Sequence, residues 1–187
     1  MSDYHIPVLL HESVDGLNIS PNGTYVDVTF GGGGHSVEIL KRLTGGKLYA
    51  FDQDADAEAN IPDNKRIVFT HGNFRYLKNY LNYYGVQHID GLLADLGVSS
   101  HHFNDPERGF TYRTDTALDM RMNRNGKLTA ETVINEYDSG KLSSVFWEYG
   151  ELHQSRKLAA TIIQHRSSKR IVTTGEFISA IEMLIPK

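Results

Sequence analysis

The chain has 187 residues, of which 40% are hydrophobic and 22% are charged, and its formal net charge at pH 7 is −4. These values predict a soluble globular protein of one or two domains and exclude a uniformly basic nucleic-acid binder. The absence of cysteine excludes disulfides and thiolate chemistry, and no apolar run approaches the length of a membrane span. The N-terminus lacks the pattern of a secretory signal, so we expect a cytoplasmic protein.

The first predicted helix begins near Pro7 and continues to Leu17. A short strand of β-branched and aromatic residues follows at 25–28 and leads into four successive glycines at 31–34. Glycine lets the backbone come close to a ligand and adopt torsion angles that a side chain forbids. A helical pattern opens at Ser36, so the unpaired amides of its first turn would face an anionic group.

A second predicted strand, residues 47–51, ends at Asp52, which lies 21 residues after Gly31. An acid at this place commonly holds ribose hydroxyls, so the glycines and Asp52 together predict an adenosine-type cofactor. The glycines alone are a weak signal, because they match G-x-G-x-x-G incompletely and also occur in tight turns. Asp27 suits S-adenosylmethionine, since an acid there can meet the ligand's ammonium group or brace the loop. Spacing alone does not separate this ligand from NAD.

Residues 54–60 predict a short helix, residues 67–70 a third strand, and residues 77–84 a helix that stops at Gly85. Residues 89–96 are mostly apolar, as expected of a strand buried on both faces. Four strands separated by three helical stretches predict a parallel, doubly wound α/β sheet.

The pattern changes after Asp95, because residues 97–125 are rich in polar, turn and arginine residues. This stretch is too long for an ordinary connection, so we predict a functional loop. The C-terminal third predicts a helical subdomain. Its helices are one capped by Ser139, one over about residues 152–165, and a last one that opens with the capping-box pattern Thr173-x-x-Glu176 and is terminated by Pro186.

Several segments carry a resemblance to a known family. They are His5-x-Pro-Val-Leu-Leu, Thr29-Phe-Gly-Gly-Gly-Gly-His-Ser, Phe51-Asp-Gln-Asp, His71-Gly-Asn-Phe, Asp95-Leu-Gly-Val-Ser-Ser, Asp105-Pro-Glu-Arg-Gly-Phe and Leu118-Asp-Met-Arg-Met. In this order, and over nearly the whole chain, they resemble the bacterial RsmH (MraW) family, whose members methylate N4 of a cytidine in the decoding region of 16S ribosomal RNA.

The resemblance implies S-adenosylmethionine as the methyl donor and 16S rRNA in the small ribosomal subunit as the partner, with no membrane contact. It implies a Rossmann-like methyltransferase sheet, interrupted after its fourth strand by an all-helical insertion subdomain. The expected domains are a cofactor-binding domain at 1–104 and a substrate loop with the helical insertion at 105–187. The oligomeric state stays open, a homodimer included.

The implied cofactor-binding residues are Gly33, Gly34, His35, Asp52, Phe74, Asp95 and His102. The first three would contact the amino-acid end of the ligand and Asp52 its ribose, while Phe74 and Asp95 would line the adenine and methionine side. His102 stands where the family usually has glutamine.

Methyl transfer requires the acceptor nitrogen in line with the methyl group, so positioning supplies much of the acceleration. Asp95, at the end of the fourth predicted strand, is the first catalytic candidate, with a purely cofactor-binding role as the equal alternative. Ser99, Ser100 and Asp119 are secondary candidates for orienting the base. Asp119 can instead pair with Arg121 or Arg113 as loop scaffolding.

The candidate RNA contacts form two groups. In the predicted loop they are Arg108, Arg113, Arg121 and Arg124 for phosphates and Phe110 or Tyr112 for stacking on a displaced base; in the helical region they are Arg156, Lys157, Arg166, Lys169 and Arg170. The alternatives are a loop packed by its aromatic residues and solvated charged faces. No metal site is expected, because the adjacent pair His101-His102 lacks zinc-ligand spacing.

Relatives in this family continue beyond the helical insertion with further strands, whereas this chain stops at Lys187. As a fragment it would leave its fourth strand as an exposed edge. Two alternative functions remain open, a nicotinamide oxidoreductase with the same strand, glycine and acid pattern, and a non-catalytic RNA-binding fragment.

Overall fold

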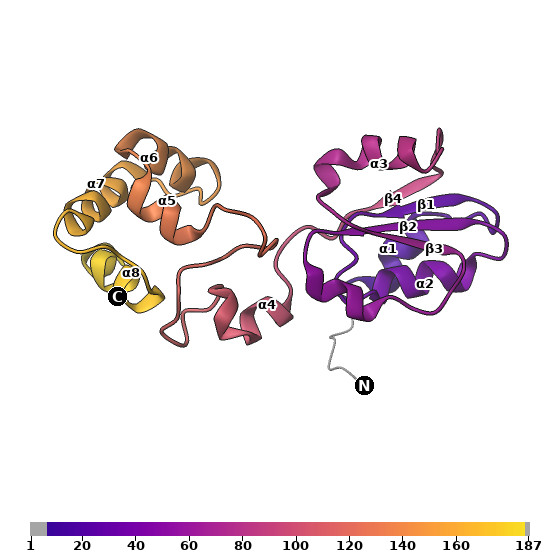
Figure 1. Cartoon of the computed structure of the whole chain (residues 1–187), viewed down its shortest axis with the longest axis horizontal. Coiled ribbons are helices and arrows are strands. Elements are labelled where there is room, and N and C mark those ends of the chain that lie inside the picture. The colour runs from indigo at the N-terminus through magenta and orange to yellow at the C-terminus, as the bar shows by residue number, and fades with distance from the viewer. Residues whose placement is uncertain (1–6, 186–187) are drawn as a thin grey trace. The chain divides into compact units, whose positions relative to one another are not determined.

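The computed structural model describes residues 7–185, which form two compact units (Figure 1). The first unit comprises the residues up to Ser99 together with Met122–Arg124, and the second comprises Ser100–Arg121 and the residues from Asn125 onward. Each unit buries hydrophobic side chains of its own. The sequence features at His5 and Pro186 lie outside the described residues.

The first unit is built on a four-stranded sheet with the strand order β3-β2-β1-β4. The strands are β1 (Thr24–Asp27), β2 (Lys47–Asp52), β3 (Ile67–His71) and β4 (Gly91–Leu93). The helices are α1 (Leu10–Gly16), α2 (Gly34–Arg42) and α3 (Leu77–Tyr83), with the 3-10 turns η1 (Ala55–Asn60) and η2 (Phe74–Tyr76). All three strand pairings are parallel, which confirms the predicted sheet.

The two faces of this sheet are covered by different helices, because successive side chains of a strand point to opposite faces. Tyr25 and Leu48 pack with residues of α1 and α2 in one cluster. Their neighbours Val26 and Tyr49 pack with residues of α3 in another. Figure 1 shows α3 over one face and α2 under the other, so the sheet is doubly wound as predicted.

Strand β4 is shorter and more exposed than predicted. It covers Gly91–Leu93 instead of residues 89–96, and the side chain of Leu92 is 43% exposed. The prediction of burial on both faces was therefore wrong. The physical reason is position, because among the described residues β4 pairs only with β1 and lies at the edge of the sheet.

Two further boundaries differ from the prediction. Helix α2 begins at Gly34, two residues before the predicted start at Ser36. The predicted helix at 54–60 is the 3-10 turn η1, in which the Asp54 side chain accepts a hydrogen bond from the amide of Asp56.

The second unit is helical. Its elements are α4 (Ser100–Asn104), η3 (Pro106–Arg108), α5 (Ala130–Glu136), α6 (Ser139–Glu148), α7 (Ser155–Arg166), α8 (Thr174–Ile181) and η4 (Glu182–Leu184). The predicted helical C-terminal third is confirmed, and the stretch predicted as a loop contains α4 and η3.

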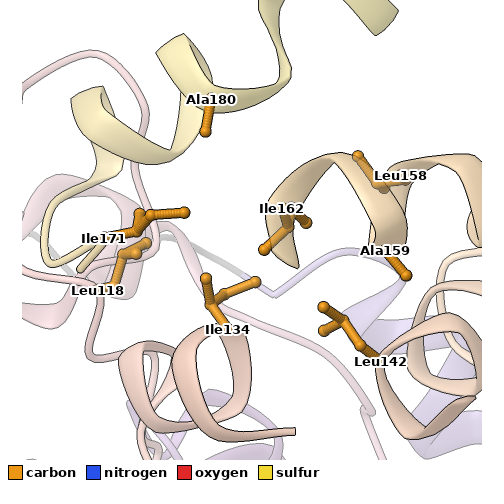
Figure 2. Close-up of a cluster of buried hydrophobic side chains, with 8 residues drawn as sticks. All are labelled: Leu118, Ile134, Leu142, Leu158, Ala159, Ile162, Ile171 and Ala180. Carbon is orange, nitrogen blue, oxygen red and sulfur yellow. The ribbon is translucent and has the colours of Figure 1, made fainter. Parts of the chain in front are cut away.

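Eight buried side chains make the core of the second unit: Leu118, Ile134, Leu142, Leu158, Ala159, Ile162, Ile171 and Ala180. They come from helices α5 to α8 and from the segments around Leu118 and Ile171, and they gather in one place (Figure 2). The backbone amide of Leu118 donates to the carbonyl of Val172, so these two distant segments lie side by side. The helices therefore share one core.

The helix caps refine the sequence predictions. Asp138, and not Ser139, caps α6, because its carboxylate accepts from the amide of Lys141. The Thr173 hydroxyl accepts from the amide of Glu176, as the capping box predicts. The return bond differs, since the Glu176 carboxylate accepts from the amide of Val172. Helix α5, capped by Thr129, was not predicted.

Candidate functional site

The glycine loop connects the carboxyl end of β1 to the start of α2 and lies beside the carboxyl end of β2. The amide of Phe30 donates to the carbonyl of Phe51 at 3.0 Å, which holds the loop against β2. Gly33 precedes α2 with φ 77°, and a Cβ atom there would stand 3.0 Å from the Phe30 ring. The position therefore favours glycine. The N-cap residue Gly33 has no side chain with which to cap α2, so among the described residues the amides of its first turn are available to an anionic group.

Asp52 lies at the end of β2 beside this loop. Its Oδ2 accepts from the amide of Gly31 at 2.7 Å, and its Oδ1 accepts from the amide of Asp54 at 2.9 Å. A carboxylate has about four acceptor positions, so both oxygens can still accept a hydroxyl group. Asp52 thus fixes the glycine loop and retains capacity for a ligand.

Asp27 is fully buried at the end of β1 and braces the loop. Its Oδ2 accepts from the Ser36 hydroxyl at 2.7 Å, and its Oδ1 accepts from the amide of Thr29 at 3.0 Å. Burial raises the pKa of Asp27, and the hydrogen bonds from Ser36 and Thr29 oppose this shift. The sequence left two roles open for Asp27, contact with the ligand's ammonium group and bracing of the loop. Its contacts with Ser36 and Thr29 match the second role.

His35 and Asp95 approach each other at the same edge of the sheet. The His35 side chain is buried, its Nδ1 lies 4.0 Å from Asp95 Oδ2, and its Nε2 has no hydrogen-bond partner among the described residues. The Asp95 side chain is 62% exposed, and its backbone amide donates to the Thr29 hydroxyl at 2.8 Å. Buried polar atoms without a partner are rare in folded proteins, so this nitrogen beside an exposed carboxylate is a candidate contact for a ligand or a water molecule.

Phe74 is brought to this edge by η2. The Asn73 side chain accepts from the amide of Arg75 and donates to Gln53 Oε1 at 2.8 Å, so η2 is tied to the residue that follows Asp52. The Phe74 side chain remains exposed. Thr29, Gln53 and Asn73 were not assigned roles from the sequence, although each is a polar residue within two positions of the end of a strand.

The remaining predicted cofactor and base-orienting residues are divided between the units. Ser99 is an exposed residue of the first unit. In the second unit, His102 is buried with its ring centroid 5.5 Å from that of Phe110, in an edge-to-face arrangement. Asp119 accepts from Arg121 Nε at 2.8 Å, and Arg121 Nη1 donates to the carbonyl of Gly126. These contacts match the scaffolding alternative for Asp119.

The predicted phosphate-binding arginines occupy unlike environments. Arg108 is only 1% exposed, and its Nη2 donates to the carbonyl of Arg121 at 3.1 Å. Arg166 donates through Nη1 and Nη2 to the carbonyls of Ile134 and Tyr137, at the end of α5. Arg113 and Arg156 are exposed. Arg108 and Arg166 thus hold backbone carbonyls, whereas the latter two face solvent.

Two other cations of the helical region are engaged within the second unit. Lys169 pairs with Glu176 at 2.6 Å, and Arg170 pairs with Glu131 at 2.8 Å and with Glu136 at 3.5 Å. Among the described residues, no group of three or more His, Cys, Asp or Glu side chains could hold a metal ion. No helix in the described part of the chain is long and apolar enough to span a membrane.

A parallel, doubly wound sheet with a glycine loop and an acid at its carboxyl edge defines a Rossmann-like fold. Residues 2–187 match the model of the MraW methylase family. The chain belongs to this family.

Curated relatives carry the name ribosomal RNA small subunit methyltransferase H. The protein of Phocaeicola vulgatus is 58% identical over 182 residues, covering 97% of this chain and 60% of the relative. That of Bacteroides thetaiotaomicron is 57% identical with the same coverage. That of Christiangramia forsetii is 53% identical over 188 residues, covering 100% of this chain and 62% of the relative. The chain thus spans about 60% of the length of these relatives.

Proposed function

We propose that the protein is an S-adenosylmethionine-dependent methyltransferase that modifies N4 of a cytidine in the decoding region of 16S rRNA, with the small ribosomal subunit as its partner. The observation that carries the proposal is the identity of 52–58% to relatives named as methyltransferases of small-subunit rRNA, over nearly the whole chain. An enzyme with this substrate would work in the cytoplasm.

The residues at the carboxyl edge of the sheet fit the cofactor. The open amides of Gly34 and His35 suit a carboxylate, and Asp52 keeps acceptor capacity for ribose hydroxyls. The unsatisfied Nε2 of His35 offers a polar contact that no described protein group fills. Phe74 supplies an exposed aromatic ring for the adenine. When bound, S-adenosylmethionine supplies an electrophilic methyl group on its sulfonium.

The protein's own residues contribute to catalysis by positioning the cytosine amino group against the methyl donor. The N4 lone pair of cytosine is delocalised into the ring, so an acceptor for the amino hydrogens favours the pyramidal, more nucleophilic form. The exposed carboxylate of Asp95 is proposed as this acceptor, because the Thr29 hydroxyl fixes its backbone at the ligand-binding edge. Ser99 is proposed to help orient the base. The pairing of Asp119 with Arg121 favours a scaffolding role for that carboxylate.

The proposed RNA contacts need exposed groups. Arg113 and Tyr112 are exposed in the second unit, as is Arg156 on α7. Phe110, Arg121 and Arg108 support the fold of their segment through the contacts described above. Arg166 does the same for α5. Exposed cations are therefore the better candidates for phosphate contact.

Calorimetric titration with S-adenosylhomocysteine and, separately, with NAD tests the cofactor. Saturable binding of the former is expected, with a large loss in Asp52→Ala and little change in Asp63→Ala, which removes an exposed carboxylate of the same unit. Methyl transfer to isolated small subunits then tests the activity. Binding of NAD without binding of S-adenosylhomocysteine would overturn the proposal in favour of an oxidoreductase. RNA binding without methyl transfer would favour the non-catalytic fragment.

A further inference from the structure

Helix α6 and the start of α7 enclose a groove of about 920 Å³ in the second unit. Its lining residues are Ser139, Gly140, Ser143, Ser144, Trp147, His153, Gln154, Ser155, Arg156 and Lys157. At its base the hydroxyl of Ser143 donates to that of Ser155 at 3.3 Å, and Ser155 is buried. This bond joins the two helices, so the groove has a defined floor. None of the proposed cofactor residues belongs to it.

An unusually placed aromatic side chain forms part of the groove. Trp147 is 53% exposed, although it belongs to the same helix as Leu142, which is fully buried in the core. Its ring centroid lies 5.7 Å from that of His153, and the two planes are inclined at 59°. The two rings therefore present an aromatic surface to solvent. Such surfaces bind unpaired nucleic-acid bases, because every base has a π-face.

The charged side chains that line the groove are both cationic. Arg156 and Lys157 are exposed lining residues, and no acidic residue is among the described residues that line the groove. The side chain of Gln154, the N-cap residue, does not cap α7. The partial positive charge at the start of this 12-residue helix therefore adds to the charges of the two cations. Three further cations of the second unit, Arg166, Lys169 and Arg170, are held by carbonyls or carboxylates.

We propose that this groove binds an unpaired stretch of the RNA substrate, at a site separate from the methyl-transfer site. A base stacks on Trp147, the adjoining phosphates lie against Arg156 and Lys157, and the serine hydroxyls are within the groove to meet the 2′-hydroxyls. The aromatic and cationic groups together favour RNA over an acidic peptide, which would use the charges and not the stacking surface. The proposal rests on the proposed function, because that function makes the ligand an RNA.

The chain itself provides the probe, because Trp147 is its single tryptophan. Titration with a short single-stranded oligoadenylate is expected to quench the tryptophan emission, whereas a duplex of the same length quenches it less. Trp147→Ala is expected to weaken binding of the fluorescently labelled oligonucleotide by about tenfold, the size of one lost base stack. Trp147→Phe, which keeps a ring, should lose less. Circular dichroism checks that both variants remain folded.

The cations have a separate test. Arg156→Gln with Lys157→Gln should reduce the slope of log affinity against log salt by about 0.7 for each lost phosphate contact. Lys65→Gln, an exposed lysine of the first unit, is the matched control and should leave the slope nearly unchanged. Unaltered RNA affinity in the Trp147 variants, or quenching by oligoglutamate and not by oligoadenylate, would overturn the proposal.

Measurements on the same samples distinguish a failure of the groove proposal from a failure of the proposed function. If S-adenosylhomocysteine binds and methyl transfer occurs while RNA leaves the Trp147 emission unchanged, the groove proposal fails alone. If RNA quenches Trp147 but no methyl group is transferred, the groove proposal stands and the enzymatic proposal fails.

Discussion

At the scale of single residues, Asp27 gives the protein a pH-dependent stability. Its folded pKa is raised by burial, so between the ordinary value of 3.8 and that higher value the folded state holds a proton that the unfolded state has lost. Stability therefore falls as pH rises through this interval and levels off above it. Asp27→Asn should remove this component, because an amide does not ionise.

Urea unfolding of both proteins across this interval provides the measurement. The difference in unfolding free energy, variant minus parent, should increase as pH rises from below 3.8 through the folded pKa. Glu38, Asp115, Asp138 and Glu176 have lowered pKa values and act in the opposite direction, but they are common to both proteins and cancel. A difference that does not vary with pH would contradict the expectation.

Arg166 is expected to stabilise the folded second unit. Its guanidinium donates to two carbonyls at the end of α5, so Arg166→Met leaves both without this charged donor. Hydrogen bonds to charged groups contribute about 1.5–3 kcal/mol each to stability. Because water can partly replace the lost donor, we expect the free energy of unfolding to fall by about 2 kcal/mol in total. Thermal unfolding of Arg166→Met and of Arg156→Met, on the same helix but exposed, measures the contrast. Equal stability of the two variants would refute the capping role.

The sequence identified residue positions better than residue contacts. Asp52 and Asp95 could be placed at the edge of the sheet because Asp52 follows one predicted strand and Asp95 lies at the end of another. The partners of Arg108 and Arg166 could not be predicted, because they are backbone carbonyls of residues distant along the chain. A carbonyl is present at every residue, so composition carries no sign of which one accepts a bond.

At the scale of elements, the start of α2 depends on Gly33. Gly33→Ala introduces a Cβ at φ 77° and 3.0 Å from the Phe30 ring, whereas Gly85→Ala introduces one at φ 72° with no atom within 4 Å. Both variants meet the left-handed cost of about 1–2 kcal/mol. Gly33→Ala alone adds a steric contact, so it should be the less stable in urea. It should also bind S-adenosylhomocysteine more weakly, and comparable behaviour of the two variants would contradict this view.

Hydrophobic periodicity predicted most helices and strands correctly. The elements that were predicted wrongly or missed each have a specific physical reason. The apolar run at 89–96 resembles a central strand, but its apolar character does not reveal that β4 has a single neighbouring strand among the described residues. Helix α5 has only seven residues, so its Thr129 cap and its buried Ile134 belong to a pattern too short for periodicity to predict a helix. Asp138 and Ser139 are both good capping residues, so the sequence could not distinguish them. The hydrogen bond from the amide of Lys141 identifies Asp138 as the cap.

At the scale of the whole molecule, two separate cores imply two responses to a ligand. A ligand that binds only the folded first unit stabilises that unit by mass action. S-adenosylhomocysteine should therefore slow amide hydrogen exchange in β1, β2 and α2 and leave α6, α7 and α8 nearly unchanged. Exchange measured by mass spectrometry provides the comparison. Equal protection of both groups of helices would indicate that the units unfold together.

The order of the strands also has a consequence for synthesis. Strand β1 pairs with β2 and with β4, and the amide of Asp95 meets Thr29 across 66 residues of sequence. As the chain leaves the ribosome, the pair of β1 and β2 can form well before β4 has emerged. The glycine loop is therefore anchored first by Asp52 and only later from the side of Asp95. The ligand-binding edge is completed from one side to the other during translation.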